Sequence, residues 1–281
     1  MDRAAIFVDA GYLCTGGGCA AAARDDVKRA EVSLHVDEVA ALIEAKARSL
    51  TGVPLLRVYW YDGAILNRLT TEQQLVAHRD SFKLRLGIIN GDGEQKEVDT
   101  KLVTDLTELA RNRAVSDAVL LGSDGDLRLG VELAQQFGVR VHLLTIEGTR
   151  VSEQLCMEAD SWTEITVDEI RTLLTVTPPP PRAAAPNDAA RTAAQADPAR
   201  ALREVAQAYV DLLGDNDRTN LTTALGRPNS LIPADHDGRL LNRARDAFGR
   251  DLERQEVHEI RACLRHSLNI GEAVPQAPRY R

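Results

Sequence analysis

The sequence predicts an α/β protein in which a mainly parallel sheet is covered by helices and is followed by a small all-α domain. Two observations predict this class. Short apolar runs alternate with segments of helical periodicity up to residue 174, which is typical of βαβ units. A proline-rich stretch then separates this part from a region in which helical periodicity alone is found.

The elements of the first part follow one another along the chain. Strands are expected at 4–9, 55–61, 118–122 and 139–145, and helices at 36–49, 71–86, 98–111 and 126–137. Residues 15–34 interrupt the pattern, and we interpret them as a flexible insertion. Their glycine triplet, 16–18, is followed by no Gly-Lys-Ser/Thr and forms no G-x-G-x-x-G pattern, which favours a mobile loop over a phosphate-binding one.

The second part begins after a predicted linker. Residues 175–200 contain a four-proline run and almost no large apolar side chain, as expected of a semi-rigid spacer. The predicted domains are therefore 1–174, the linker 175–200, a helical domain 201–271 and a tail 272–281. The helices of the predicted helical domain are expected at 201–213, 219–225, 235–248 and 252–268, with Gly214, Gly226, Gly249 and Gly271 as C-caps.

Seven arginines crowd the last two predicted helices: Arg239, Arg243, Arg245, Arg250, Arg254, Arg261 and Arg265. Two interpretations remain open. The arginines could contact nucleic-acid phosphates, or they could form a solvated face on a module for packing, for a protein partner or for self-association.

The net charge lowers the expectation of general nucleic-acid binding. The chain carries a formal charge of −8. Residues 1–175 contain 19 Lys and Arg against 28 Asp and Glu, a net charge of −9, whereas the remainder carries +1. A first domain that binds RNA would need a local basic rim and a metal ion to offset its own acids.

Other features predict a cytoplasmic protein. No apolar stretch approaches the roughly 20 residues that span a bilayer, and the N-terminal apolar run is too short for a signal peptide. The four cysteines lack zinc-binding C-x-x-C spacing and are expected to be free thiols.

Acidic residues lie where three predicted elements begin or end. Asp9 closes the first apolar run, Asp124 and Asp126 follow the run at 118–121, and Asp99 opens the helix at 98–111. Ligands bind outside the carboxyl ends of parallel strands, so these acids are expected to converge. Carboxylates gathered without matching bases repel one another, and divalent cations prefer oxygen ligands. The pattern therefore predicts a metal-dependent site.

Each acid also has a structural alternative. Asp99 in a first helical turn favourably meets the helix dipole, and Asp124 and Asp126 could cap the next helix. Asp105 is on the apolar face of its helix, where it could support the site or pair with Lys101 four residues earlier.

Basic and aromatic residues near these acids are weaker candidates. Lys96, Lys101 and Arg128 could meet a phosphate backbone. Arg57, Trp60 and Tyr61 could stack on a base, although a role in covering the sheet is favoured. The six histidines show no metal-ligand spacing, no Ser/His/Asp motif is found, and we assign the histidines no chemistry.

Four motifs occur in a fixed order: FVDAGYL at 7–13, KEVDTKL at 96–102, GSDGDL at 122–127, and SEQL at 152–155 with Ala159-Asp160 after it. Together they resemble the NYN domain, a branch of the PIN-like nucleases that includes the LabA-like proteins. The resemblance covers roughly residues 3–170 and leaves the C-terminal helices unexplained. It implies a Rossmann-like PIN fold whose acids, at Asp9, Asp99, Asp124 and Asp126, hold Mg²⁺ or Mn²⁺.

The activity that the resemblance implies is metal-dependent hydrolysis of phosphodiester bonds in RNA, with single-stranded or unpaired regions as the expected substrate. One position departs from the family, since Tyr12 stands where many relatives have Asn. The alternative hypothesis is a catalytically silent RNA- or protein-binding module that acts through the C-terminal helices.

Overall fold

The structure is a computed structural model that describes residues 2–64, 69–89, 95–96, 98–177, 197–227 and 230–270. The chain divides into two compact units. The first comprises Met1–Asn67 and Val76–Pro179, and the second comprises Arg68–Leu75 and Pro180–Arg281. A short segment from the middle of the chain thus groups with the C-terminal helices.

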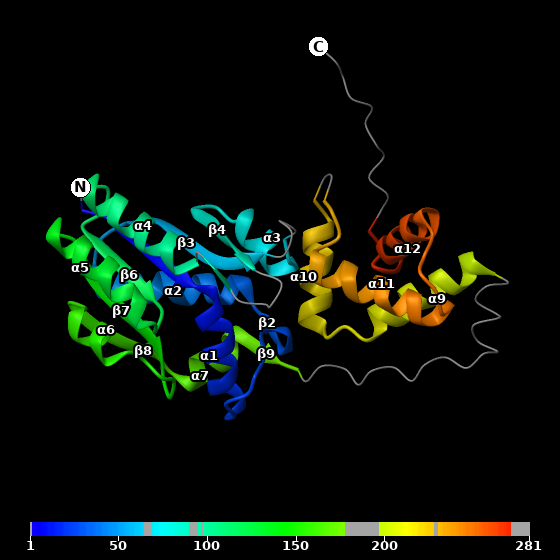
Figure 1. Cartoon of the computed structure of the whole chain (residues 1–281), viewed down its shortest axis with the longest axis horizontal. Helices are drawn as coiled ribbons and strands as arrows, with labels where there is room; N and C mark the ends of the chain where they lie inside the picture. The colour runs from blue at the N-terminus through cyan, green and yellow to red at the C-terminus, as the bar shows by residue number, and fades with distance from the viewer. Residues whose placement is uncertain are drawn as a thin grey trace, which may run out of the picture. The chain divides into compact units, whose positions relative to one another are not determined.

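The first unit is built on one seven-stranded sheet with the strand order β5-β4-β3-β1-β6-β7-β8. Figure 1 labels β3, β4, β6, β7 and β8 of this sheet. The strands are β1 Ala4–Asp9, β3 Leu55–Ala64, β4 Phe82–Ile89, β5 Gln95–Lys96, β6 Asp117–Leu121, β7 Arg140–Ile146 and β8 Ser161–Ile165. Within this sheet all neighbours run parallel except β5, which is antiparallel to β4. The predicted α/β class with a mainly parallel sheet is confirmed.

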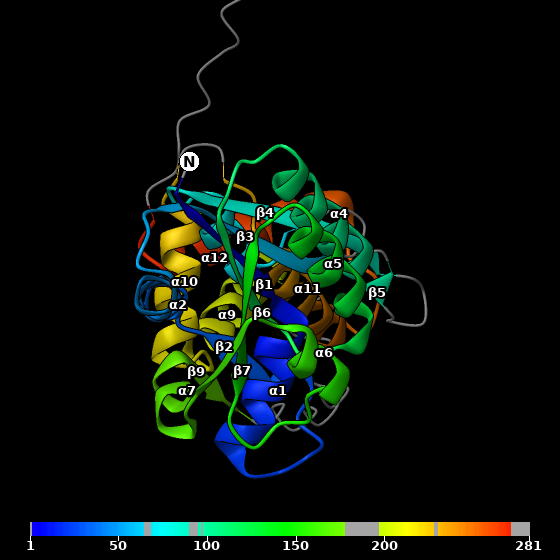
Figure 2. The same cartoon turned by 90° about the vertical axis from the view of Figure 1, so that its left-hand side faces the viewer.

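Helices cover both faces of this sheet (Figure 2). They are α1 Ala10–Ala22, α2 Val36–Thr51, α4 Val98–Arg111, α5 Arg128–Gln136, α6 Glu153–Glu158 and α7 Val167–Leu173, with short 3-10 turns η1 Arg29–Glu31 and η2 Gly125–Leu127. On one face α4 and α5 bury Leu102, Leu106 and Val131 against Phe7 and Leu120. On the other face α1 and α2 contact β1 and β3, and α7 packs against both of these helices.

The predicted flexible insertion at 15–34 is wrong. Residues 15–22 belong to the helix α1, and the rest contains η1 and a strand, β2 Val32–Leu34, that pairs antiparallel with β9 Leu174–Val176. The glycines of α1 allow close packing. A Cβ atom at Gly17 would lie 3.0 Å from Leu174, and one at Gly18 would lie 2.8 Å from Val27 and from Val32. The glycine triplet is therefore a packing surface of a helix, which local composition did not reveal.

The single helix expected at 71–86 is also wrong. The helix α3 Thr71–Ala77 ends early, Ser81 takes a positive φ of 63°, and the chain continues as β4. Phe82, Leu84 and Leu86 alternate with Lys83 and Arg85, which is the period of a strand. This strand pairs in parallel with β3 from Val58 onward, a contact that sequence periodicity over so short a run could not establish.

The second unit consists of α9 Pro198–Asp211, α10 Asp215–Leu225, α11 Ala234–Phe248 and α12 Arg254–Ser267, joined by Arg68–Leu75. Leu202, Leu240, Phe248 and Leu264 are in its core. The segment from the middle of the chain is bound by hydrogen bonds, since the amide and hydroxyl of Thr71 donate to the Asp235 carboxylate at 3.2 Å each. The amide of Ala234 also donates to the carbonyl of Leu69 at 2.9 Å.

The helix ends of this unit agree only in part with the predicted glycine caps. Gly226 and Gly249 are C-caps, and Gly249 takes the left-handed conformation at φ 65°. Gly214 is instead the N-cap of α10, and Gly271 lies outside the described residues. The predicted linker also lies mostly outside them, at 178–196, whereas Thr175 and Val176 belong to β9.

Most of the arginines of the last two helices bond within the unit. Arg250 pairs with Glu256 and Arg261 pairs with Asp237, each at 2.7 Å. Arg245 pairs with Asp251 at 3.3 Å, and Arg265 donates to backbone carbonyls. These contacts match the packing interpretation for four of the seven arginines.

Candidate active site at the carboxyl edge of the sheet

The candidate site lies at the carboxyl ends of β1 and β6. These strands are neighbours, and the strand order reverses between them, because the chain leads from β1 to β3 on one side and returns to β6 on the other. Such a switch point leaves a crevice where open α/β sheets bind ligands. Asp9 ends β1, and the turn that holds Asp124 and Asp126 follows β6.

Asp9 is both a strand end and the N-cap of α1. Its carboxylate accepts a hydrogen bond from the backbone amide of Tyr12 at 3.1 Å. Because this amide is one of the unsatisfied donors of the first helical turn, capping fixes the carboxylate at the helix start.

The turn after β6 approaches Asp9 closely because it begins with glycine. A Cβ atom at Gly122 would lie 2.9 Å from Leu127 and 3.8 Å from the Cβ of Asp9. Asp124 is the N-cap of η2, and its carboxylate accepts from the amide of Asp126 at 3.0 Å. Asp124 thus caps a helical turn, as the structural alternative expected, and this cap fixes its carboxylate beside the end of β1. Both Asp124 and Asp126 are exposed.

Asp99 is the second residue of α4 and is half-buried. Burial raises its pKa, and so do the negative charges of Asp124 and Asp126. The start of α4 and the turn after β6 therefore share one electrostatic environment, and the neighbours acting on Asp99 are acidic.

The pKa of Asp9 is raised from 3.8 to about 6. Burial is the largest cause, opposed by the hydrogen bond from Tyr12, and the charges of Asp99 and Asp62 raise it further. The charge of Asp99 contributes to the raised pKa of Asp9, and the charges of Asp124 and Asp126 contribute to that of Asp99. All four predicted acids therefore interact electrostatically, directly or through Asp99. Carboxylates that raise one another's pKa need an added positive charge to be stable as anions together.

Asp62 was missed by the sequence reasoning. It lies in β3, one residue beyond Tyr61, the register partner of Asp9. Its side chain is 5 % exposed, and it accepts from the amide of Gly63 at 2.8 Å. Asp62 directly follows the predicted strand at 55–61, just as Asp9 closes the predicted strand at 4–9. The search for acids at strand ends would therefore have found Asp62 if it had been applied to this strand as well.

Throughout the described ranges, no three His, Cys, Asp or Glu side chains are grouped so that they could hold a metal ion. The donor chemistry nevertheless fits a hard cation, since the acids offer carboxylate oxygens. Mg²⁺ keeps several of its waters and is usually bound through one or two carboxylates together with substrate phosphates, so it needs no preformed cage.

Tyr12 connects α1 to the end of β7. The amide of Ile146 donates to its hydroxyl oxygen at 2.8 Å. The hydroxyl also lies 2.7 Å from Oγ1 of Thr149, which in turn donates to the carbonyl of Ile146 at 2.7 Å. The side chain of Tyr12 therefore connects the helix start that is capped by Asp9 to the end of β7.

The remaining candidates near the site form internal contacts. Asp105 accepts from the Tyr61 hydroxyl at 2.9 Å and pairs with Arg85 at 2.8 Å. Lys101 donates to the carbonyl of Leu86 at 2.5 Å. Arg128 pairs with Glu158 at 3.6 Å, and side-chain contacts of Lys96 lie outside the described structure.

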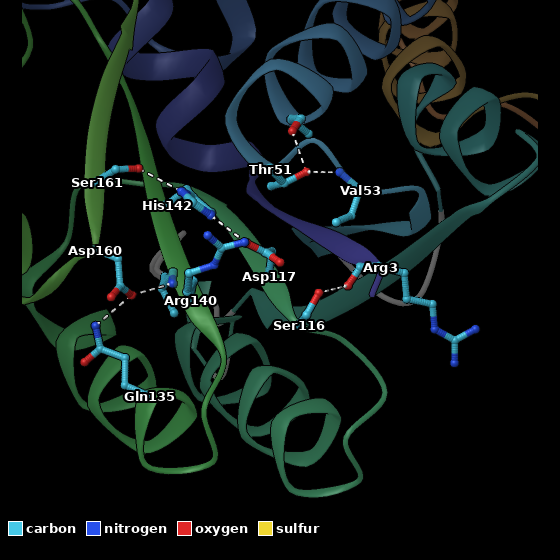
Figure 3. Close-up of polar contacts among 12 residues, drawn as sticks. Arg3, Thr51, Val53, Ser116, Asp117, Gln135, Arg140, His142, Asp160 and Ser161 are labelled. Atoms are coloured by element: carbon cyan, nitrogen blue, oxygen red, sulfur yellow. Dashed lines mark hydrogen bonds and ion pairs between the residues drawn. The ribbon is translucent and has the colours of Figure 1, made fainter. Parts of the chain in front are cut away.

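A second polar cluster lies at the amino edge of the sheet, and Figure 3 shows it. His142 lies between the buried Asp117, with Nε2 at 3.0 Å from Oδ1, and Ser161, with Nδ1 at 2.8 Å from Oγ. Arg140 pairs with the same Asp117 oxygen at 2.8 Å. No sequence motif predicted this Asp-His-Ser arrangement, because the residues come from the beginnings of three separate strands. It links β6, β7 and β8 at the edge opposite the candidate site.

The family follows from a comparison with known domains. The NYN domain matches residues 3–166, which is more than half of the chain and includes every predicted site acid. The chain belongs to the NYN domain family. NYN domains are part of the PIN-like nuclease superfamily, so the predicted family is confirmed.

Two similar proteins extend the comparison of this NYN protein. The uncharacterized protein y4oD of Sinorhizobium fredii (strain NBRC 101917 / NGR234) is 40% identical over 210 residues, which cover 71% of this chain and 97% of that protein. A crystal structure of the protein of unknown function VPA0982 from Vibrio parahaemolyticus RIMD 2210633 aligns with a TM-score of 0.44 and 20% identity, over 62% of this chain and 96% of that one.

The cysteines Cys14, Cys19, Cys156 and Cys263, all within the described residues, form no disulfide bond. Among the described helices, none is both long and apolar enough to cross a membrane.

Proposed function

We propose that this NYN protein is a metal-dependent ribonuclease that hydrolyses phosphodiester bonds in single-stranded or unpaired RNA. One observation carries the proposal: Asp9 at the end of β1, Asp99 at the start of α4 and the acids of the turn after β6 interact at the switch point of the sheet. Burial there raises the pKa values of Asp9 and Asp99, and the charges of neighbouring carboxylates raise them further. Membership in a nuclease superfamily supports the same reaction class.

We assign the metal to the predicted acids. Asp9, Asp99 and Asp124 would hold the principal Mg²⁺ or Mn²⁺ ion, and Asp126 would support a second ion or orient a water molecule. When bound, such an ion lowers the pKa of its water and stabilises negative charge on the leaving oxygen. The products would carry a 5′-phosphate and a 3′-hydroxyl.

The chain itself contributes the placement and the ionisation of these groups. The amide of Tyr12 holds the carboxylate of Asp9, and the amide of Asp126 holds that of Asp124. Because the pKa of Asp9 is about 6, its carboxylate is anionic and able to bind a cation at neutral pH. The buried Asp62 adds negative charge beside Asp9, which favours a cation there.

The direct test is cleavage of a labelled single-stranded RNA by the full chain with Mn²⁺, Mg²⁺ or EDTA. We expect metal-dependent cleavage that Asp9→Asn and Asp124→Asn each reduce by at least about a hundredfold, as for loss of a group that stabilises the transition state. Asp168→Asn is the matched control, because that carboxylate is exposed on α7 and pairs only weakly at the surface with Arg171. Equal loss in the control, or no cleavage by a folded wild type, would reject the proposal.

Metal binding can be measured without activity. Saturating Mg²⁺ or Mn²⁺ should raise the melting temperature of the wild type, because an ion that binds only the folded state stabilises it by about 2.7 kcal/mol at a hundred times its Kd. The shift should be smaller in Asp99→Asn and unchanged in Asp168→Asn.

The alternative function is a catalytically silent module that binds RNA or protein through its helical unit. It is favoured by the lack of a preformed metal-binding group within the described residues. RNA binding that needs no metal and is retained in Asp124→Asn, without cleavage, would support this alternative.

A further inference from the structure

The loop from Glu147 to Ser152 is attached at both ends to the elements that hold the candidate acids. At one end Thr149 contacts the hydroxyl of Tyr12 at 2.7 Å, three residues beyond Asp9. At the other end the amide of Ser152 donates to the carbonyl of Ser123 at 3.0 Å, directly before Asp124. The loop thus spans the carboxyl edge from the start of α1 to the turn after β6.

Further contacts restrict the same loop. The hydroxyl of Ser152 would lie 2.9 Å from a Cβ atom at Gly125, so the loop and the turn touch. The amide of Glu147 donates to the carbonyl of Ile165 at 2.9 Å, and its carboxylate accepts from the amide of Val167 at 2.9 Å. A residue on this loop therefore has a defined backbone position, which lowers the entropic cost of binding a ligand.

Arg150 lies between the two attachment points and is exposed. Two other arginines of the same unit are engaged in ion pairs, Arg128 with Glu158 and Arg85 with Asp105. In contrast, no acid in the described part of the chain forms an ion pair with Arg150. Arg150 is thus an exposed cation on a loop that is attached to both acid-bearing elements, and it is available to an external anion.

We infer that Arg150 is a substrate-binding residue that contacts a backbone phosphate of the RNA next to the cleaved bond. This inference rests on the proposed function and names the residue that offsets the repulsion between the acidic unit and a polyanion. A guanidinium binds phosphate oxygens through two parallel hydrogen bonds, which a single ammonium cannot do. A contact to one flanking phosphate carries affinity and register, and no base preference.

The test separates binding from cleavage. Binding of a fluorescein-labelled single-stranded RNA is measured by anisotropy in full-length Asp9→Asn protein, alone and combined with Arg150→Ala, Arg150→Lys or Arg48→Ala. Arg48 is the matched control, since it is also exposed but is in the last turn of α2, at the opposite edge of the sheet. We expect Arg150→Ala to weaken binding about tenfold, Arg150→Lys to retain part of the affinity, and Arg48→Ala to change it less than twofold.

The salt dependence gives a second readout that loss of folding would not imitate. Losing one phosphate contact to a single strand should reduce the slope of log K against log salt by about 0.7. In cleavage assays of the protein with its acids intact, Arg150→Ala should raise KM and leave kcat within about twofold.

The outcomes for the two proposals are distinguishable. Absence of cleavage by the wild type rejects the ribonuclease, and the binding assay still tests Arg150. Equal affinities and equal salt slopes for Arg150→Ala and Arg48→Ala would overturn the inference about Arg150, even where metal-dependent cleavage is observed.

Discussion

The backbone amide of Tyr12 donates to the carboxylate of Asp9 at 3.1 Å, while the hydroxyl of the same residue accepts from the amide of Ile146 at 2.8 Å. One side chain thereby connects the first turn of α1 to the end of β7. The ring also lies over the next helical turn, because a Cβ atom at Gly16 would be 3.1 Å from it. Tyr12 therefore stabilises the backbone that presents Asp9.

Tyr12→Phe should lower the free energy of unfolding by about 1–2 kcal/mol, because it removes the partner of the Ile146 amide and of Thr149 at a partly buried site. Chemical denaturation measures this loss. Tyr59→Phe is the matched control, since that residue in β3 contributes ring stacking with Phe7 at 5.4 Å and the stacking survives the change. Equal losses of stability in both variants would argue against a stabilising role for the hydroxyl of Tyr12.

Asp9→Asn should stabilise the metal-free protein at neutral pH. The pKa of Asp9 is about 6 in the folded chain against 3.8 ordinarily, so the folded state binds its proton more tightly than the unfolded state does. Stability contributed by the protonated carboxyl is therefore complete below about pH 4 and is lost as pH rises through about 6. The amide variant avoids this loss and caps a helix about as well as Asp.

Melting of Asp9→Asn and of the wild type in EDTA from pH 3 to 8 measures the difference between their free energies of unfolding. This difference should reach up to about 3 kcal/mol above pH 7 and vanish below pH 4. A variant that is less stable than the wild type at pH 8 would contradict the assigned pKa.

Gly18→Ala should destabilise the protein by about 1–3 kcal/mol, although alanine has the higher helix propensity. The new Cβ would lie 2.8 Å from Val27 and from Val32, so the β2 segment must move. Gly238→Ala is the opposite control in α11, where nothing lies within 4 Å of the added atom. That change should stabilise by about 0.5–1 kcal/mol. Thermal melting of both variants compares the two signs directly.

Asp117→Asn should lower stability by about 2–4 kcal/mol and leave RNA cleavage unchanged. The carboxylate is fully buried and bonds both Arg140 and His142, so its loss leaves two cationic or polar partners uncompensated. The cluster is at the edge opposite the candidate site. Ser161→Ala should likewise retain cleavage and cost about 1 kcal/mol. Loss of cleavage at full stability in either variant would instead assign chemistry to the Asp-His-Ser cluster.

Periodicity predicted the elements whose burial follows a regular pattern. The helix at 98–111 was predicted with its observed bounds, because Val98, Leu102 and Leu106 repeat at helical spacing and are buried on one face. The strand at 4–9 was predicted equally well, since a central parallel strand is apolar throughout. Strand ends followed by acids likewise located the region where Asp9 and Asp124 lie.

Errors arose where distant contacts decide the conformation. The segment at 71–86 divides between a helix and a strand because Thr71 bonds Asp235 of the helical unit, whereas Phe82 pairs with β3. The glycines of α1 resemble a loop by composition, and their role depends on Val27, Val32 and Leu174, which approach only in the folded chain.

The sequence by itself determined the α/β class, the order of its main elements and the family to which the chain belongs, because these follow from local periodicity and from short motifs. Tertiary structure alone decided which residues meet. It brought Asp62 beside Asp9, assembled Asp117, His142 and Ser161 from three strands, and attached the loop of Arg150 to both acid-bearing elements. The physical reason is that pKa shifts, ion pairs and close packing depend on distances of a few ångströms between residues that lie far apart in the chain.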